Sequence, residues 1–274
     1  MKLAPPITSR TNARAKALRA GFSGKSAKPG ELVGIEGENL LLEALQAGIA
    51  VESVFVREGR EALLSQPGLR SVSAANVVVL SSDVFASAVD TASPQGVAAL
   101  VRIPEIRSPD DSVSGVVLLL EAMQDPGNLG TLLRTAEAFG VAQVFATPDS
   151  VIPWNPKTVR ASAGSVFRVP VRRMTLDEAQ RSLKDNGVRL YAAVAEGEGA
   201  TACMDADLTR RCALMIGNEG AGLSAAALAL ADVRIHIPCA TESLNAAVAG
   251  TVLMYEVMRQ RTVVAAREFA GGHR

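Results

Sequence analysis

The sequence is poor in cysteine, histidine and aromatic residues, and it lacks any long hydrophobic run. No apolar stretch approaches the ~20 residues that a membrane-spanning helix needs, and the amino terminus, MKLAPPITSR, has no apolar centre of the kind found in signal peptides. The three cysteines, Cys203, Cys212 and Cys239, are odd in number and form no CxxC pair. We therefore expect a cytoplasmic protein without a membrane segment, a disulfide framework or a bound metal.

The chain does contain enough apolar residues for a large core. Its 274 residues are 48% hydrophobic, which favours one large domain or two modest ones. The two histidines, His236 in a predicted strand and His273 in the tail, look incidental. Any acid–base chemistry must therefore be performed by other residues.

Charge is balanced overall but unevenly distributed. Lys and Arg number 28, as do Asp and Glu, yet residues 1–30 contain basic side chains and no acid. A second acid-free basic run lies between Asp149 and Asp177. Either run could be an ordinary solvated segment, but two of them in a neutral chain favour nucleic-acid binding. The candidate RNA contacts are Arg10, Arg14, Lys16, Lys157 and Arg160.

Residues 31–103 are predicted to form a small α/β domain after a basic arm over residues 1–30. Short apolar runs alternate with helical periodicity, which is typical of a three-layer fold. The segment contains no histidine or cysteine and no catalytic constellation, so a binding or packing module is favoured. Pro104 and Pro109 indicate a linker over residues 104–114.

Regular alternation of strand and helix patterns from residue 115 to the carboxyl terminus predicts a doubly wound, mainly parallel sheet. The predicted strands are 116–123, 143–146, 166–171, 189–195, 213–217 and 233–237, and the predicted helices are 129–139, 157–163, 176–186, 225–231 and 243–261.

The segment 118–140 is the centre of this second domain. A buried apolar strand ends at Asp125-Pro126-Gly127, and Asn128 is expected to cap the following helix. Asn128 and Arg134 would then lie at the carboxyl end of a parallel strand, where open α/β sheets bind ligands. The alternative is an ordinary strand–turn–helix with a surface arginine.

Two further motifs follow strands. In IGNEGAGLS, residues 216–224, three glycines allow close backbone approach to a ligand and Glu219 adds a carboxylate. Its late position and GxxGxG spacing do not fit a dinucleotide fingerprint, which disfavours a nucleotide-dependent oxidoreductase. In IPCATESLN, residues 237–245, Ser243 and Asn245 could hold a ligand or simply cap the last helix.

Taken together, and in this order, the three motifs resemble the signature motifs of the SpoU or TrmH-type ribose methyltransferases of the SPOUT superfamily. The resemblance extends along the chain. Further similar segments are Ser9-x-x-Asn12-x-x-x-Lys16, Ile35-Glu-Gly37, Glu43-Ala-Leu45, Thr91-x-Ser-Pro-Gln-Gly96 and Arg160-x-Ser-Ala-Gly164.

The resemblance implies a small α/β RNA-binding domain followed by a mainly parallel methyltransferase sheet with a carboxyl-terminal trefoil knot, a rare exception to unknotted folds. It also implies S-adenosylmethionine as the methyl donor, and a homodimer whose active site is completed across the interface. The implied catalytic residues are Arg134, Asn128, Glu219, Ser243 and Asn245. The implied donor-binding residues are Thr147, Ala195, Ile216, Gly217, Gly220, Ile237 and Leu244.

The implied reaction is 2′-O-ribose methylation of a structured RNA. Ribosomal RNA is favoured, because the amino-terminal domain is typical of the branches that act on it. Transfer RNA, thiostrepton-resistance methylation of ribosomal RNA, and a non-catalytic RNA-binding assembly factor remain as alternatives. Arg134 is unsuited to be a simple base because a guanidinium stays protonated.

The loop Cys239–Glu242 is shorter than is usual in the family, and Ala246-Ala247 replace bulkier residues, so a tighter donor pocket is expected.

Overall fold

The computed structural model describes residues 3–25, 28–70, 72–105, 115–197 and 199–271. Two compact units are present: residues up to 105 together with Ile152–Arg168 form the first, and the remainder forms the second. A stretch between two strands of the second unit thus belongs to the first unit. Most of the segment predicted to be a linker lies outside the described residues.

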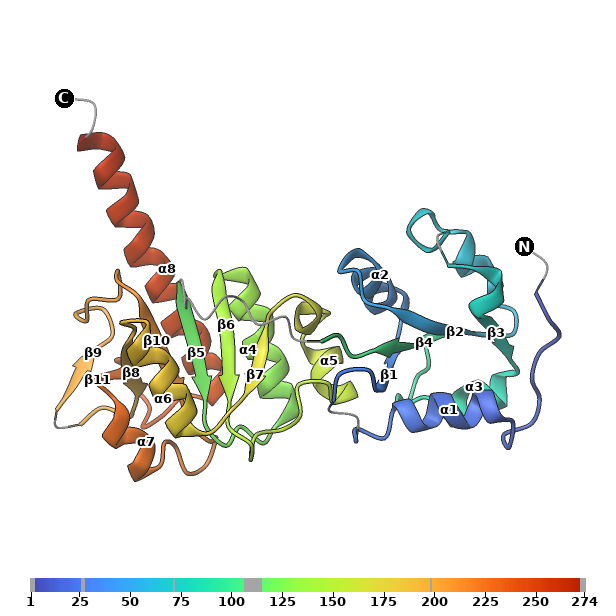
Figure 1. Ribbon diagram of the computed structural model, residues 1–274, viewed down its shortest axis with the longest axis horizontal. Helices are drawn as coiled ribbons and strands as arrows, with labels where there is room; N and C mark the ends of the chain where they lie inside the picture. Colours follow the sequence, from blue (N-terminus) through green and yellow to red (C-terminus); the bar gives the residue numbers. More distant parts are fainter. Residues whose placement is uncertain (1–2, 26–27, 71, 106–114, 198, 272–274) are drawn as a thin grey trace. The chain divides into compact units, whose positions relative to one another are not determined.

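The first unit is a four-stranded sheet covered on both faces (Figure 1). Its strands, in spatial order, are β1 (Leu32–Glu36), β4 (Val97–Arg102), β2 (Val51–Arg57) and β3 (Val77–Leu80). β4 is antiparallel to both neighbours, and β2 is parallel to β3. Helix α2 (Glu38–Gln46) covers one face, and helices α1 (Ala13–Gly21) and α3 (Ser82–Ala88) cover the other. The predicted three-layer α/β fold is therefore confirmed.

Shorter elements complete this unit. They are η1 (Glu61–Ser65), η2 (Pro67–Leu69), η3 (Ala74–Asn76), α5 (Pro156–Ala161) and η4 (Ser165–Phe167). Part of the predicted basic arm is folded, because α1 buries Ala15 and Leu18 in the core formed with α3 and the sheet. The helix begins after Asn12, whose side chain accepts a hydrogen bond from the Arg14 N–H.

The loop 91–96, which ends in Pro-Gln-Gly, is held by a buried carboxylate. Glu36 is 5% exposed and accepts hydrogen bonds from the Thr91 hydroxyl at 2.6 Å and the Gln95 N–H at 2.8 Å. Because a buried carboxylate needs such partners, the end of β1 and the loop before β4 stabilise each other.

The second unit is a seven-stranded sheet in which every neighbouring pair is parallel. In spatial order, its strands are β7 (Val171–Arg173), β6 (Val141–Ala146), β5 (Val116–Leu120), β10 (Cys212–Ile216), β8 (Arg189–Ala193), β11 (Val233–His236) and β9 (Ala200–Ala202). Helices α6 (Leu176–Asp185) and α7 (Ala225–Leu230) pack on one face through a shared apolar core. Helices α4 (Pro126–Ala138) and α8 (Ala246–Gly271) pack together on the other, where Gly250 allows close approach to Leu132.

Two sequence predictions in this region are wrong. The apolar run 166–171 was expected to be one strand, but its first part is the 3₁₀ turn η4, and β7 begins only at Val171. Val166 and Phe167 are buried in the first unit, where Phe167 packs on Trp154 at 5.8 Å between ring centroids. The last helix begins at Ala246, three residues after the predicted start.

Helix α8 is held to the second unit by polar side chains as well as by apolar ones. Gln260 accepts from the Leu208 N–H at 3.0 Å and donates to the Ala206 carbonyl at 3.1 Å. Hydrogen bonds from the Arg259 guanidinium hold the pKa of Glu256 below its usual range. Within the described residues, no helix is both long and apolar enough to span a bilayer.

Candidate active site

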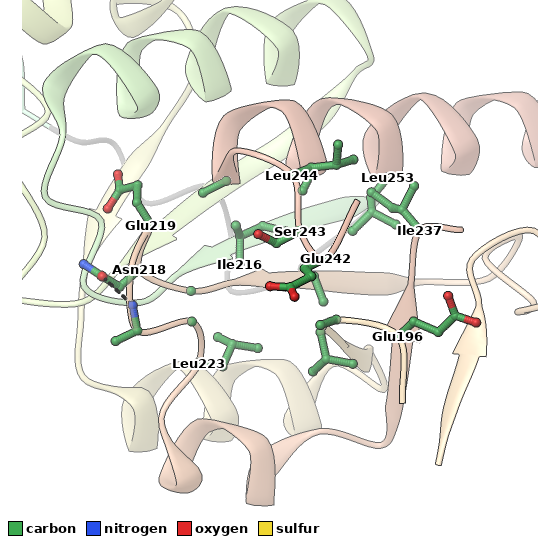
Figure 2. Close-up of a pocket in the computed structure, with 18 of the residues that line it drawn as sticks. Glu196, Ile216, Asn218, Glu219, Leu223, Ile237, Glu242, Ser243, Leu244 and Leu253 are labelled. Carbon is green, nitrogen blue, oxygen red and sulfur yellow. Dashed lines mark hydrogen bonds between the residues drawn. The ribbon is translucent and has the colours of Figure 1, made fainter. Parts of the chain in front are cut away.

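Three loops that follow β8, β10 and β11 enclose a cavity of about 390 Å³ (Figure 2). Residues 193–196 follow β8, residues 217–223 follow β10, and residues 237–244 follow β11. Parallel strands place their carboxyl ends at one edge of the sheet, so these loops meet although they are distant in sequence. The first residues of α8 close one side.

The start of α4 differs from the prediction. Asp125, not Asn128, is the N-cap, and its carboxylate accepts from the Asn128 N–H at 2.7 Å. Pro126 occupies the first helical turn, where the missing N–H has no cost. The Asn128 side chain is consequently not needed for capping and is available for another interaction.

That interaction joins all three motifs. The side-chain amide of Asn128 donates to the Glu219 carboxylate at 2.9 Å, and the side-chain amide of Asn245 donates to the Asn128 side-chain oxygen at 3.2 Å. The Asp125 N–H also donates to Glu219, at 3.3 Å. These residues are 91 and 117 positions apart in sequence, so only the tertiary structure brings them together.

Asn245 combines both roles that the sequence left open. Its side-chain oxygen accepts from the N–H groups of Ala247 and Val248, at 2.9 and 3.2 Å, and so caps α8, while its amide joins the network. Ser243 does not cap the helix but lines the cavity.

Arg134 lies on the exposed side of α4, outside this network. Its side chain makes no hydrogen bond or ion pair with any residue that the structure describes. The guanidinium keeps its full set of donors for a ligand.

Six of the seven predicted donor-binding residues line the cavity: Ala195, Ile216, Gly217, Gly220, Ile237 and Leu244. Thr147 does not. It lies beside a different hollow of about 260 Å³, with Glu121 and Asp149. The sequence prediction missed Asn218, Leu223 and Glu242, which also line the cavity. All three lie inside the two motifs at residues 216–224 and 237–245, so their positions were a usable signal.

The cavity fits S-adenosylmethionine in chemistry. Leu223, Leu244 and Leu253 offer apolar surface for a purine ring, and carboxylates of Glu196 and Glu242 complement a cationic donor. Figure 2 shows the Glu242 side chain directed into the hollow.

The five candidate RNA contacts all belong to the first unit and are all exposed. Arg10, Arg14 and Lys16 lie at or before α1, and Lys157 and Arg160 lie on α5. The first basic run and the first part of the second, Ile152–Arg168, therefore belong to one folding unit, whereas Arg172 and Arg173 belong to the second unit. Arg160 also approaches Asp90 at 3.7 Å, an exposed pair of little energetic weight.

The loop that follows β10 tolerates no side chain at Gly217. A Cβ there would lie 2.3 Å from the Gly222 carbonyl carbon. We expect Gly217→Ala to lower the free energy of unfolding by about 2 kcal/mol, as overpacking does, measured by urea denaturation. Gly197, where an added Cβ would have no neighbouring atom within 4 Å, is the matched control; an equal effect of Gly197→Ala would contradict the explanation.

Comparison with known proteins shows the family to which this chain belongs. The SpoU rRNA methylase family matches residues 115–255, and the substrate-binding domain of RNA 2′-O ribose methyltransferases matches residues 35–107. The chain is 36% identical to the 23S rRNA (guanosine(2553)-2′-O)-methyltransferase RlmP of Bacillus subtilis, over 81% of this chain and 87% of that protein.

Solved structures are similar over nearly the whole chain. A crystal structure of an RNA 2′-O ribose methyltransferase has a TM-score of 0.79 and 31% identity, and covers 94% of this chain and 100% of that one. AviRb from Streptomyces viridochromogenes, a SpoU methyltransferase solved with AdoMet, has a TM-score of 0.78 and 26% identity, with 92% and 100% covered. The chain therefore belongs to the SpoU rRNA methylase family and is an S-adenosylmethionine-dependent RNA 2′-O-methyltransferase.

Proposed function

We propose that this enzyme methylates the ribose 2′-hydroxyl of one nucleotide in ribosomal RNA. The observation that carries the proposal is the network of Asn128, Glu219 and Asn245, which joins three motifs beside the donor-shaped cavity. The name of the Bacillus subtilis relative, a 23S rRNA methyltransferase, supports this RNA class. Transfer RNA is the alternative substrate that the test includes.

The reaction needs alignment and charge stabilisation more than a strong base. When bound, the donor supplies an electrophilic sulfonium methyl group. Arg134 would bind the 2′-oxygen and the neighbouring phosphate, and would stabilise the negative charge that develops on the oxygen as its proton is released to water. The methyl group would pass to this oxygen as the carbon–sulfur bond breaks, and the donor would leave as the neutral thioether. Glu219, Asn128 and Asn245 hold the start of α4 in place, and Ser243 faces the reacting groups from the cavity wall. The donor would be held by Ile216, Gly217, Gly220, Ala195, Ile237 and Leu244, which line the cavity.

The basic residues of the first unit supply RNA affinity in this proposal. Arg10, Arg14 and Lys16 are exposed around the start of α1, and Lys157 and Arg160 are exposed on α5. Because phosphate contacts position RNA without reading its sequence, the nucleotide is selected by RNA shape and by unpaired bases.

The proposal also includes a homodimer formed through α4 and α8. Val248 and Tyr255 on α8 are 48% and 49% exposed, and Tyr255 packs edge to face on Phe139 at the end of α4, 5.9 Å between centroids. Exposed apolar side chains on a helix that already packs on α4 suit a partner surface. Arg134, on the same α4, would then face a site completed by the second copy.

Two further expectations complete the proposal. The enzyme works in the cytoplasm, which cell fractionation would test. Its carboxyl-terminal segment passes through a loop as a trefoil knot, and an experimental map traced without a knot would contradict this.

Arg134→Ala is expected to lower the rate of methyl transfer at least about 100-fold, because an electrostatic contact to the reacting oxygen is lost. The measurement uses labelled donor with unmodified ribosomal and transfer RNA, and scores an alkali-resistant dinucleotide. Donor affinity by calorimetry is expected to stay unchanged, and Arg134→Lys to recover little activity. The surface variant Arg181→Ala serves as the control; wild-type rates in Arg134→Ala would refute the role.

Replacing Arg10, Arg14 and Lys16 by Ala is expected to weaken RNA binding and to reduce the slope of log K against log salt by about one per lost phosphate contact. Filter binding across a salt series measures both, and Arg181→Ala on α6 is the control. An unchanged slope would show that these three side chains are merely solvated and make no phosphate contacts.

Tyr255→Glu is expected to convert a dimer to a monomer in sedimentation equilibrium, because it buries a charge in the apolar interface. Met204, 56% exposed in the turn after β9, gives the control Met204→Glu, which should remain dimeric. A monomeric wild type, or dissociation by Met204→Glu instead, would contradict the proposed interface.

A further inference from the structure

The turn between β5 and α4 contains a residue in an unusual backbone conformation. Ala122 has a φ of +51°, in the left-handed region that residues with a Cβ rarely adopt. It lies three residues before the N-cap Asp125. The direction in which the chain enters α4, the helix of Asn128 and Arg134, therefore depends on this conformation.

Side chains from two other loops hold both polar backbone groups of Ala122. The Thr147 hydroxyl, after β6, accepts from the Ala122 N–H at 2.9 Å. The Asn218 amide, after β10, donates to the Ala122 carbonyl at 2.9 Å. Thr147 is only 4% exposed, and its hydroxyl proton is directed to Asp149. We call Thr147, Ala122 and Asn218 the Ala122 clamp.

Asn218 also belongs to the wall of the cavity. Its side-chain oxygen accepts from the N–H groups of Gly220 and Ala221, at 2.9 and 3.0 Å, and its backbone exchanges two hydrogen bonds with Gly222, both 3.0 Å (Figure 2). The next residue, Glu219, accepts from Asn128. One side chain thus fixes the shape of the loop after β10 and the turn that begins α4.

We propose that the Ala122 clamp positions the first turn of α4 against the donor loop, and that Thr147 and Asn218 are positioning residues for methyl transfer. The proposal rests on the proposed function of the cavity. Without its partners, Ala122 relaxes to a common backbone conformation, which redirects the chain into α4. Asn128 and Arg134 then move away from the reacting geometry, while the donor-binding surface is retained.

The test compares Thr147→Val, which keeps the shape but loses the acceptor, with Thr147→Ser, which keeps the hydroxyl. Thr147→Val is expected to lower kcat about 10-fold or more, because small displacements of catalytic groups are costly. Its donor Kd by calorimetry should stay within about twofold of wild type, and Thr147→Ser should retain near-wild-type kcat. An unchanged kcat in Thr147→Val would overturn the proposal, as would a loss of donor affinity as large as the loss of kcat.

Variants of Asn218 separate its two functions. Asn218→Asp keeps the oxygen that accepts from Gly220 and Ala221 but lacks the N–H that binds Ala122. It should therefore lower kcat without weakening donor binding, because the added negative charge in the cavity wall favours a cationic donor. Asn218→Ala removes both and should weaken donor binding as well. Equal effects of the two variants on kcat and Kd would overturn the assignment.

Ala122→Gly provides a rescue, because glycine adopts positive φ without penalty. In the clamp proposal, Thr147→Val lowers kcat and the thermal unfolding midpoint by smaller amounts in an Ala122→Gly background than in the wild-type background. If the effects of Thr147→Val and Ala122→Gly were additive in both kcat and the unfolding midpoint, the clamp proposal would be overturned. Thermal unfolding can be measured without activity. An inactive wild type would therefore refute the proposed function, but the clamp would still be tested by comparing the unfolding midpoints of the wild type, the two single variants and the double variant.

Discussion

The carboxylate of Glu219 receives hydrogen bonds from the side chain and the backbone of the turn that begins α4. Those bonds require the loop after β10 to lie beside the loop after β5, which the parallel pairing of these two neighbouring strands ensures. Asn245 extends the same network to the start of α8. The site therefore depends on a single sheet edge where three chain segments meet, and hydrogen bonds within the protein hold Asn128, Glu219 and Asn245 together.

Preorganisation has a local cost that the structure meets with specific hydrogen bonds. Gly217 allows backbone to approach backbone, and Ala122 adopts positive φ with both polar groups bound. Such conformations persist only when surrounding contacts determine them, and they are concentrated at functional sites. The buried Glu36 plays a comparable part in the first unit, where it fixes the loop before β4.

The association of Ile152–Arg168 with the first unit changes how the basic segments are understood. Along the sequence, the basic run around Lys157 falls within the methyltransferase domain. In the structure, α5 packs on β1, so Lys157 and Arg160 belong to the same unit as the basic residues of α1. These exposed basic side chains therefore belong to a unit distinct from the one whose residues line the donor cavity.

The sequence by itself determined the alternation of strands and helices, the order of the three motifs and the two acid-free basic runs. These features depend on local periodicity, on glycine and proline at element ends, and on composition, all of which act over a few residues. It also contained the signal for Asp125 as the N-cap, since Asp followed by Pro is a preferred helix start. Only the tertiary structure decided that Asn128 binds Glu219 and that Thr147 binds Ala122 rather than lining the cavity. It also decided that residues 152–168 belong to the first unit. These contacts join residues separated by tens of positions, and their formation depends on strand order and chain path, which local patterns do not encode.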